Sequence, residues 1–169
     1  MFSGKSEELI RRLKRARIAH QKVEIFKPAI DIRYAVDDIV SHDASRIPCT
    51  PVDSSGSIQL MASGVDVVGI DEAQFFDQGI VETAEHLALS GIRVIIAGLD
   101  MDFTGKPFGP MPALLSKAEY ITKLHAICMK CGDIANYSYR KTDHGATILL
   151  CETDVYEPRC RDCFYKGAS

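Results

Sequence analysis

Near the start of the chain, apolar residues recur at the spacing of one helical face. Between residues 7 and 20, Leu9, Leu13 and Ala16 follow one another at intervals of four and three, and Ile10 flanks them. Arginine and lysine fill the other face. This pattern predicts an amphipathic helix whose apolar side faces a core.

A second helical pattern lies in the middle of the chain, over residues 79–92. Its apolar face is formed by Ile80, Ala84, Leu87 and Ala88. Gly91 follows in the position of a C-terminal cap, where glycine accepts a left-handed backbone. We expect a further short helix over residues 111–118.

Short apolar runs predict the strands. Residues 22–26 (KVEIF) form the first, closed by Pro28. Residues 65–71 (VDVVGID) and 93–98 (RVIIAG) are apolar runs typical of strands buried on both faces, and residues 120–127 predict a further strand. Because strands alternate with helices, we expect right-handed crossovers and a parallel sheet.

Two segments lack a clear period. Residues 41–57 are rich in Ser, Asp and Pro and are expected to be mostly loop, with room for one short strand. Residues 99–110 also predict a loop. After Cys128 the chain becomes polar and rich in Tyr and Cys, so we place a domain boundary near residue 127.

Composition narrows the class of protein. The chain has 169 residues, is 46% hydrophobic and carries a formal net charge of −3. A protein that binds nucleic acid mainly by neutralising phosphates is usually basic, so this charge argues against such a partner. No apolar run approaches the roughly 18 residues of a membrane span, and residues 1–12 have no signal-peptide core. We expect a cytoplasmic protein that does not bind membranes.

The first chemical motif is Ser3-Gly4-Lys5-Ser6, directly before the first predicted helix. It matches the second half of a phosphate loop, G-x-x-x-x-G-K-[ST]. In such loops glycine lets backbone N–H groups close on phosphate oxygens, lysine reaches the β- and γ-phosphates, and serine offers a hydroxyl to Mg²⁺. The helix N-terminus adds partial positive charge.

The first glycine of this motif would lie two residues before Met1. We therefore expect that residues precede Met1 in the intact protein and supply the strand that anchors the loop. The alternative is that Gly-Lys-Ser stands by chance at a helix N-terminus. The motif alone leaves both open.

Acidic residues follow the buried strand 65–71. Ligands of open parallel sheets gather at the carboxyl ends of strands. There Asp71 can hold Mg²⁺ through water, and Glu72 can take a proton from an attacking hydroxyl. The alternative is a solvated turn or helix cap. Asp31 and Arg33 follow the first predicted strand, and Arg33 can clamp a phosphate, although a surface ion pair is the simpler interpretation.

Four of the six cysteines are paired by spacing. Cys128-x-x-Cys131 and Cys160-x-x-Cys163 are typical of two knuckles that complete a tetrahedral zinc site. Two disulfides or a redox-active pair are the alternatives, and Cys49 and Cys151 stand outside the pattern. Because four thiolates fill every ligand position, the metal would be structural and its binding energy would stabilise a small domain.

Together these residues closely resemble the thymidine kinase family of the zinc-containing type found in the human cytosol and in bacteria. The resemblance spans nearly the whole chain. It is carried by residues 1–6 (MFSGKS), 26–34 (FKPAIDIRY), 69–76 (GIDEAQFF), 97–109 (AGLDMDFTGKPFG) and the second cysteine pair in 156–163 (YEPRCRDC).

The resemblance implies a role for each matching residue. Glu72 would be the general base for the 5′-hydroxyl. ATP and Mg²⁺ would bind beside Ser3, Gly4, Lys5, Ser6, Asp31, Arg33, Asp71 and Gln74. The thymine base would lie among Met1, Phe75, Leu99, Phe103, Phe108 and Tyr156. An extended segment held by zinc, the lasso of this family, would read the base edge with the backbone of Thr147, Ile148, Leu149, Leu150 and Cys151.

The resemblance thus implies an α/β fold. Residues 1–127 would form a RecA-like phosphate-loop core with a parallel sheet, and residues 128–169 a zinc-ribbon lasso domain. The activity implied is transfer of the ATP γ-phosphate to thymidine by a homotetramer inhibited by dTTP. Because one methyl group is worth only about 1–3 kcal/mol of discrimination, deoxyuridine is an expected second substrate.

Two other functions stay open at this point. A nucleic-acid-binding ATPase with a zinc ribbon would share the phosphate loop and the cysteines. Against it, residues 132–159 carry three basic residues and five acidic ones. A structural module with a degenerate nucleotide site is the other alternative.

Overall fold

The computed structural model describes residues 2–29, 38–40, 46–141 and 155–166. Its centre is a parallel four-stranded sheet with the strand order β4-β1-β5-β6. The strands are β1 (Val23–Pro28), β4 (Thr50–Val52), β5 (Val67–Ile70) and β6 (Arg93–Ile96). The predicted α/β class with a parallel sheet is confirmed.

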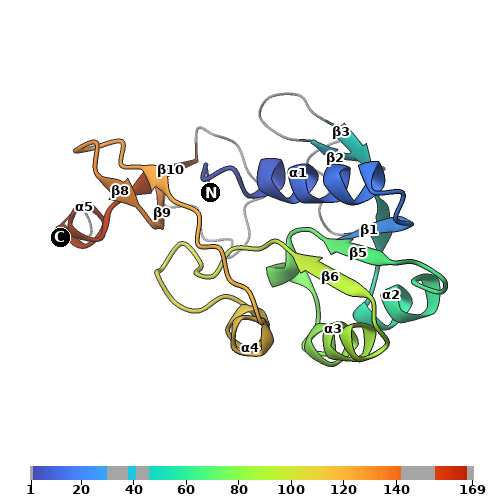
Figure 1. Ribbon diagram of the computed structural model, residues 1–169. Helices are drawn as coiled ribbons and strands as arrows, with labels where there is room; N and C mark the ends of the chain where they lie inside the picture. The colour runs from blue at the N-terminus through green and yellow to red at the C-terminus, as the bar shows by residue number, and fades with distance from the viewer. Residues whose placement is uncertain (1, 30–37, 41–45, 142–154, 167–169) are drawn as a thin grey trace.

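Helices cover both faces of this sheet (Figure 1). The long helix α1 (Lys5–Ile18) lies on one face, and α2 (Ser55–Met61) and α3 (Ile80–Leu89) lie on the other. A shorter helix, α4 (Met111–Lys117), packs beside α3. The helices predicted over 7–20, 79–92 and 111–118 are thereby confirmed, with small shifts at their ends.

Alternation along β1 divides the core into two layers. Ile25 packs with Leu9 and Leu13 of α1, whereas the next residue, Phe26, packs in the cluster beneath α2 and α3. Gly69 of β5 lets α1 approach closely, because a Cβ there would lie 2.8 Å from Leu13 Cδ1. A larger residue at this position would therefore force the Leu13 side chain to move.

Three details of the predicted elements are wrong. In the described part of 41–57, residues 46–52 contribute strands β3 (Arg46–Pro48) and β4, and α2 begins at Ser55. Among the described residues β6 pairs only with β5, at the edge of the sheet, and within β6 only Ile95 is buried. Ala88 of α3 is exposed, and Thr83 takes its place in the buried face.

The strand predicted over 120–127 is also wrong for most of its length. Only Ala126–Ile127 form a strand, β7, and Tyr120 and Ile121 are exposed. None of residues 120–125 is paired in a described strand. A strand needs a neighbour for its backbone groups, and no described strand provides one for residues 120–125.

Small antiparallel pairs build the rest of the molecule. Strand β2 (Asp38–Val40) pairs with β3. Strand β7 pairs with β8 (Ile134–Ala135), and β9 (Tyr137–Arg140) pairs with β10 (Tyr156–Arg159), which leads into helix α5 (Arg161–Lys166). We call β7–β10 with α5 the cysteine module. The boundary expected at residue 127 stays a prediction.

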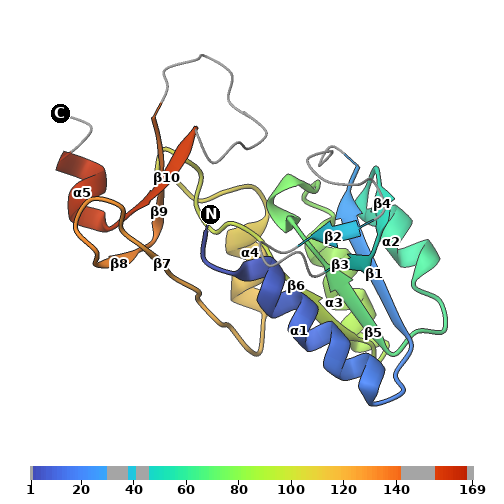
Figure 2. The ribbon, with the colours of Figure 1, turned by 90° about the horizontal axis from the view of Figure 1, so that it is seen from above.

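The cysteine module lies beyond the N-terminal end of α1 (Figures 1 and 2). Aromatic side chains fill its centre. Tyr137 stacks on Phe164 with ring centroids 4.6 Å apart, and Tyr139 and Tyr165 meet Phe164 edge-on. Within the described part of the chain, no helix combines the length and apolar character that a membrane crossing requires.

Candidate functional site

The Ser3-Gly4-Lys5-Ser6 motif forms a tight turn that opens into α1. Gly4 is the N-cap residue with φ 75°, a left-handed conformation that glycine adopts without strain. Its carbonyl accepts the Glu8 backbone N–H at 3.0 Å, which begins the helical ladder. Lys5 is the first residue of the 14-residue helix. The turn therefore presents the positive end of a long helix, which is suited to an anion.

The acidic pair lies at the carboxyl end of β5, as the sequence predicts. The Asp71 N–H donates to the Phe26 carbonyl at 3.0 Å, which extends the pairing of β5 with β1. Asp71 is buried, and its Oδ1 accepts the Glu72 N–H at 2.9 Å. Its Oδ2 lies 3.5 Å from the Ser6 hydroxyl that donates to it. The fold thus joins the predicted magnesium serine and aspartate, 65 residues apart.

Gln74 connects the acidic pair to the next loop. Its side-chain amide donates to the Glu72 carboxylate, and its Oε1 accepts the Leu99 backbone N–H at 2.9 Å. Gln74 is only 3% exposed, so both ends of its amide are held inside the protein. Glu72 itself has φ 49°, a left-handed conformation that is uncommon outside glycine. The side chain of Glu72 is therefore oriented by its own backbone and by Gln74.

Two glycines make room for Gln74. A Cβ at Gly109 would lie 2.4 Å from the Gln74 carbonyl oxygen, and Gly109 has φ 50°. A Cβ at Gly98 would lie 3.0 Å from Gln74 Oε1 and 2.6 Å from Met111 Sδ. Both glycines belong to the motif 97–109 on which the family resemblance rests. Their presence in that motif was the only indication in the sequence of this close packing.

The loop 99–110 carries the aromatic residues expected around a base. Phe108 meets Phe75 edge-on, with ring centroids 5.5 Å apart and an interplanar angle of 85°. The Arg140 guanidinium lies 5.0 Å from the centroid of the Phe103 ring. Arg140 also stands opposite Tyr156 across the β9–β10 pair. Sequence reasoning missed Arg140, which links the loop to the strand that carries Tyr156.

The four paired cysteines come together. The sulfur atoms of Cys128, Cys131, Cys160 and Cys163 all lie within 4.8 Å of one another. Cys131 Sγ and Cys160 Sγ are 3.6 Å apart, close to the sulfur separation of about 3.8 Å in a tetrahedral site with Zn–S bonds of about 2.3 Å. The residues therefore fit a structural metal ion such as zinc, and each pair comes from a different part of the chain.

Hydrogen bonds around the cluster favour an ionised sulfur. Burial raises the pKa of the Cys128 thiol, but hydrogen bonds from the backbone N–H groups of Cys160, Lys130 and Cys131 outweigh it and lower that pKa to about 6. Hydrogen bonding first to Cys160 and then to Cys131 raises the pKa of Cys163 to about 12. Neighbouring thiols cannot all lose their protons easily, because the resulting negative charges would repel one another. A cation bound among them would remove this repulsion and favour the thiolate forms.

The cysteine module touches both ends of the candidate site. Phe2 of the phosphate turn packs against the cluster formed by Ala126, Cys128, Ala135 and Cys160. At the other end, a Cβ on Gly105 would lie 3.4 Å from the rings of Tyr137 and Phe164, so the loop 99–110 also rests on the module. Sequence reasoning missed Phe2, although it lies inside the quoted motif 1–6.

Some predicted site residues lie outside the described part of the chain. These are Met1, Asp31, Arg33, Thr147, Ile148, Leu149, Leu150 and Cys151. Their roles stay predictions.

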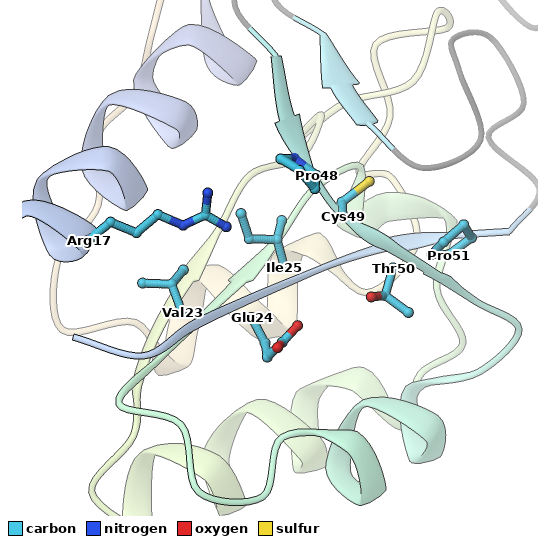
Figure 3. A pocket seen from close by; sticks show the side chains of 8 residues that line it. All are labelled: Arg17, Val23, Glu24, Ile25, Pro48, Cys49, Thr50 and Pro51. Atoms are coloured by element: carbon cyan, nitrogen blue, oxygen red, sulfur yellow. The ribbon is translucent and has the colours of Figure 1, made fainter. Parts of the chain in front are cut away.

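A cleft of about 380 Å³ lies elsewhere, at the start of β1 (Figure 3). Arg17, Glu24, Cys49 and Thr50 contribute its polar side chains. None of the predicted site residues lines it. The convergence of Ser6, the acidic pair and Gln74 therefore marks the candidate site, and this cleft does not.

Comparisons with known proteins agree with this geometry. The family model described as "Thymidine kinase" matches residues 1–164. The thymidine kinase of Bacteroides thetaiotaomicron is 61% identical over 167 residues, which are 99% of this chain and 84% of that protein. The thymidine kinase of Porphyromonas gingivalis is 59% identical, over 100% of this chain and 83% of that protein. The thymidine kinase of Rhodothermus sp. is 57% identical, over 97% and 77%. The chain therefore belongs to the thymidine kinase family.

Proposed function

We propose that this protein is a thymidine kinase, which transfers the γ-phosphate of ATP to the 5′-hydroxyl of thymidine and releases dTMP and ADP. The supporting observation is one continuous series of hydrogen bonds. It runs from Ser6 through Asp71 and Glu72 to Gln74 and the Leu99 backbone. It joins a phosphate-binding turn to an aromatic loop, the two subsites that a nucleoside kinase needs.

Each residue along this series has a separate role in the proposed phosphoryl transfer. The thymidine 5′-oxygen attacks the γ-phosphorus, the bond from that phosphorus to the β-γ bridging oxygen breaks, and Glu72 accepts the hydroxyl proton. Lys5 and the α1 N-terminus stabilise the phosphate charge, and Ser6 and Asp71 would hold the Mg²⁺ that accompanies ATP. Because phosphoryl transfer depends mostly on positioning and charge, these groups suffice for the chemistry. We assign Asp31 and Arg33 to the same phosphates.

The base subsite is proposed on the other side of Gln74. Phe75 and Phe108 form an aromatic corner, and Tyr156 lies on β10 opposite Arg140. We assign Leu99, Phe103 and Met1 to the same pocket, and the backbone of Thr147–Cys151 to the polar edge of thymine. Only one methyl group separates deoxyuridine from thymidine, so deoxyuridine is proposed as the second substrate.

We assign zinc to Cys128, Cys131, Cys160 and Cys163. Their sulfur atoms lie within 4.8 Å of one another, a spacing suited to a closed tetrahedral site. Zinc, when bound, would cross-link the β7–β8 turn to the start of α5. It would thereby hold β9 and β10, the strands on either side of the proposed lasso segment. It would supply structural stability, because all four ligand positions are filled by protein.

Further properties follow from family resemblance. We propose a cytoplasmic homotetramer that is inhibited by dTTP at the thymidine subsite. Sedimentation at micromolar concentration should give a mass of four chains, and dTTP inhibition should be overcome by thymidine. The family match favours the kinase over a nucleic-acid-binding ATPase.

The activity is tested by incubating the protein with Mg-ATP and a panel of the common ribo- and deoxyribonucleosides. Thymidine should be phosphorylated fastest, deoxyuridine second, and the purine nucleosides hardly at all. If ATP binds but no nucleoside is phosphorylated, the proposal is wrong.

A further inference from the structure

Phe2 joins two parts of the molecule that are far apart in sequence. Its side chain packs against Ala126, Cys128, Ala135 and Cys160, and Cys163 packs against the same cluster. Cys128 and Cys160 of this cluster are proposed metal ligands, so the ring packs against a cluster that includes part of the metal site. Figures 1 and 2 place the start of the chain between α1 and the cysteine module, where this contact occurs.

Phe2 also has an uncommon backbone conformation. Phe2 has φ 62°, a left-handed conformation that is rare for a bulky residue. Such conformations persist only where the surrounding structure holds them. The same turn reaches Lys5, the proposed phosphate ligand, only three residues later, and Gly4 within it is also left-handed. The Phe2 ring and the turn that is proposed to bind ATP are therefore joined by a short stretch of constrained backbone.

We propose that Phe2 is a positioning residue through which the metal in the cysteine cluster controls the affinity for MgATP. This inference rests on the proposed kinase function. It differs from the lasso assignment, which ties the metal to the thymidine subsite through residues 147–156. Here the same metal also acts on the opposite subsite, through a packing contact at the other end of the chain.

The test is equilibrium binding of the non-hydrolysable β,γ-imido analogue of ATP with Mg²⁺. Wild type and Phe2→Ala are each measured with zinc and after zinc is removed by a chelator. We expect Phe2→Ala and zinc removal each to weaken binding of the analogue about tenfold. In Phe2→Ala, zinc removal should add less than about twofold, because the two changes break the same connection.

Two further measurements separate positioning from simple stabilisation. Phe2→Leu, which keeps an apolar side chain, should restore most of the affinity, and the Kd of thymidine should stay within about twofold in Phe2→Ala. Ile134→Ala is the matched control, because Ile134 is exposed on β8 of the same module. Zinc content, measured by atomic absorption, should stay at one ion per chain in all three variants.

Several outcomes would overturn the inference. One is wild-type affinity for the analogue in Phe2→Ala. Another is that the losses of affinity caused by Phe2→Ala and by zinc removal multiply when both changes are made. A third is loss of zinc from Phe2→Ala, which would show that the ring only stabilises the cluster. In each case the wild type still binds the analogue and the kinase proposal stands. A wild type with no affinity for the analogue would overturn both proposals.

Discussion

The buried side-chain amide of Gln74 donates a hydrogen bond to the carboxylate of Glu72. Glu72 is the proposed general base, and its left-handed backbone conformation and this hydrogen bond together orient its carboxylate. The other end of the amide is held by the Leu99 backbone. The orientation of the base therefore depends, through Gln74, on a loop that begins 25 residues after Gln74.

Replacing Gln74 tests this arrangement. Gln74→Leu keeps the approximate volume but removes both hydrogen bonds. We expect kcat to fall about 10- to 100-fold, since small displacements of a catalytic group have effects of this size, while the KM of ATP changes little. Gln59→Leu, on the exposed side of α2, is the matched control. Unchanged kcat in steady-state assays of Gln74→Leu would show that Glu72 is positioned without Gln74.

Glu72 itself should be required for chemistry and not for binding. Glu72→Gln removes the proton acceptor and keeps the shape, so we expect kcat to fall about 10²- to 10⁴-fold. Equilibrium binding of thymidine and of MgATP should remain near wild type. Glu85→Gln removes a carboxylate from an exposed ion pair with Lys117 and serves as the control. A Glu72→Gln enzyme that keeps a tenth of its activity would exclude Glu72 as the base.

Gly109 should not tolerate a side chain. In Gly109→Ala the new Cβ would meet the Gln74 carbonyl oxygen at 2.4 Å, so the loop or Gln74 must move. Gly64→Ala is a close control, because Gly64 also has a positive φ, 74°, but nothing lies within 4 Å of its Cβ position. We expect Gly64→Ala to cost about 1–2 kcal/mol from backbone strain alone.

Gly109→Ala should cost more than that and should also reduce kcat. Urea unfolding and steady-state kinetics of both variants provide the comparison. Equal stability and equal kcat in the two alanine variants would mean that the Gln74 contact has no influence on the site.

Disrupting the cysteine cluster should affect the module before the core. Cys160→Ser should lower zinc affinity at least about tenfold and raise the KM of thymidine, while α1 and the parallel sheet stay folded. Zinc titration, thymidine kinetics and far-UV circular dichroism measure the three effects. Cys49→Ser alters a buried cysteine outside the cluster and should leave zinc binding intact. If Cys160→Ser keeps both zinc and the thymidine KM, the lasso assignment is wrong.

Glu8 provides a prediction on pH dependence. Hydrogen bonds from Arg11 and then Arg12 lower the pKa of Glu8 from its ordinary value of 4.5 to about 2. Because the folded-state pKa is the lower one, the stabilisation is complete above about pH 4.5 and is lost as the pH falls toward 2. Glu8→Gln should therefore reduce stability at pH 7 by about 0.2–0.5 kcal/mol for each ion pair.

The difference between wild type and Glu8→Gln should shrink between pH 4.5 and 2. Urea unfolding over this range measures it, with Glu82→Gln on the exposed side of α3 as the control. A difference that stays constant from pH 7 to pH 2 would contradict the ion-pair assignment.

Local pattern carried much of the fold. The interval of three and four residues between Leu9, Leu13 and Ala16 predicts α1, and the apolar run 65–71 predicts β5, because each element buries a face that its own sequence marks. Local pattern did not predict β3 and β4. Each is three residues long, and they contain Pro48 and Pro51 respectively. So short a strand shows too little alternation to be distinguished from a loop.

The strand predicted over 120–127 fails for a different reason. Its residues have suitable composition, but a strand forms only when another strand pairs with its backbone, and no described strand pairs with residues 120–125. Strand β6 also depends on its neighbours. Its apolar sequence suggests burial on both faces, but among the described strands it lies at the edge of the sheet.

The phosphate turn, the acidic pair and the two cysteine pairs are all recognisable in the amino-acid sequence. They are recognisable because residues a few positions apart form motifs that favour a particular chemistry. The contact of Ser6 with Asp71, the hydrogen bond from Gln74 to Glu72 and the packing of Phe2 on the cysteine cluster are apparent only in the folded structure. These contacts join residues that are distant in sequence or depend on one backbone conformation, so they follow from strand register and packing, which no local pattern encodes.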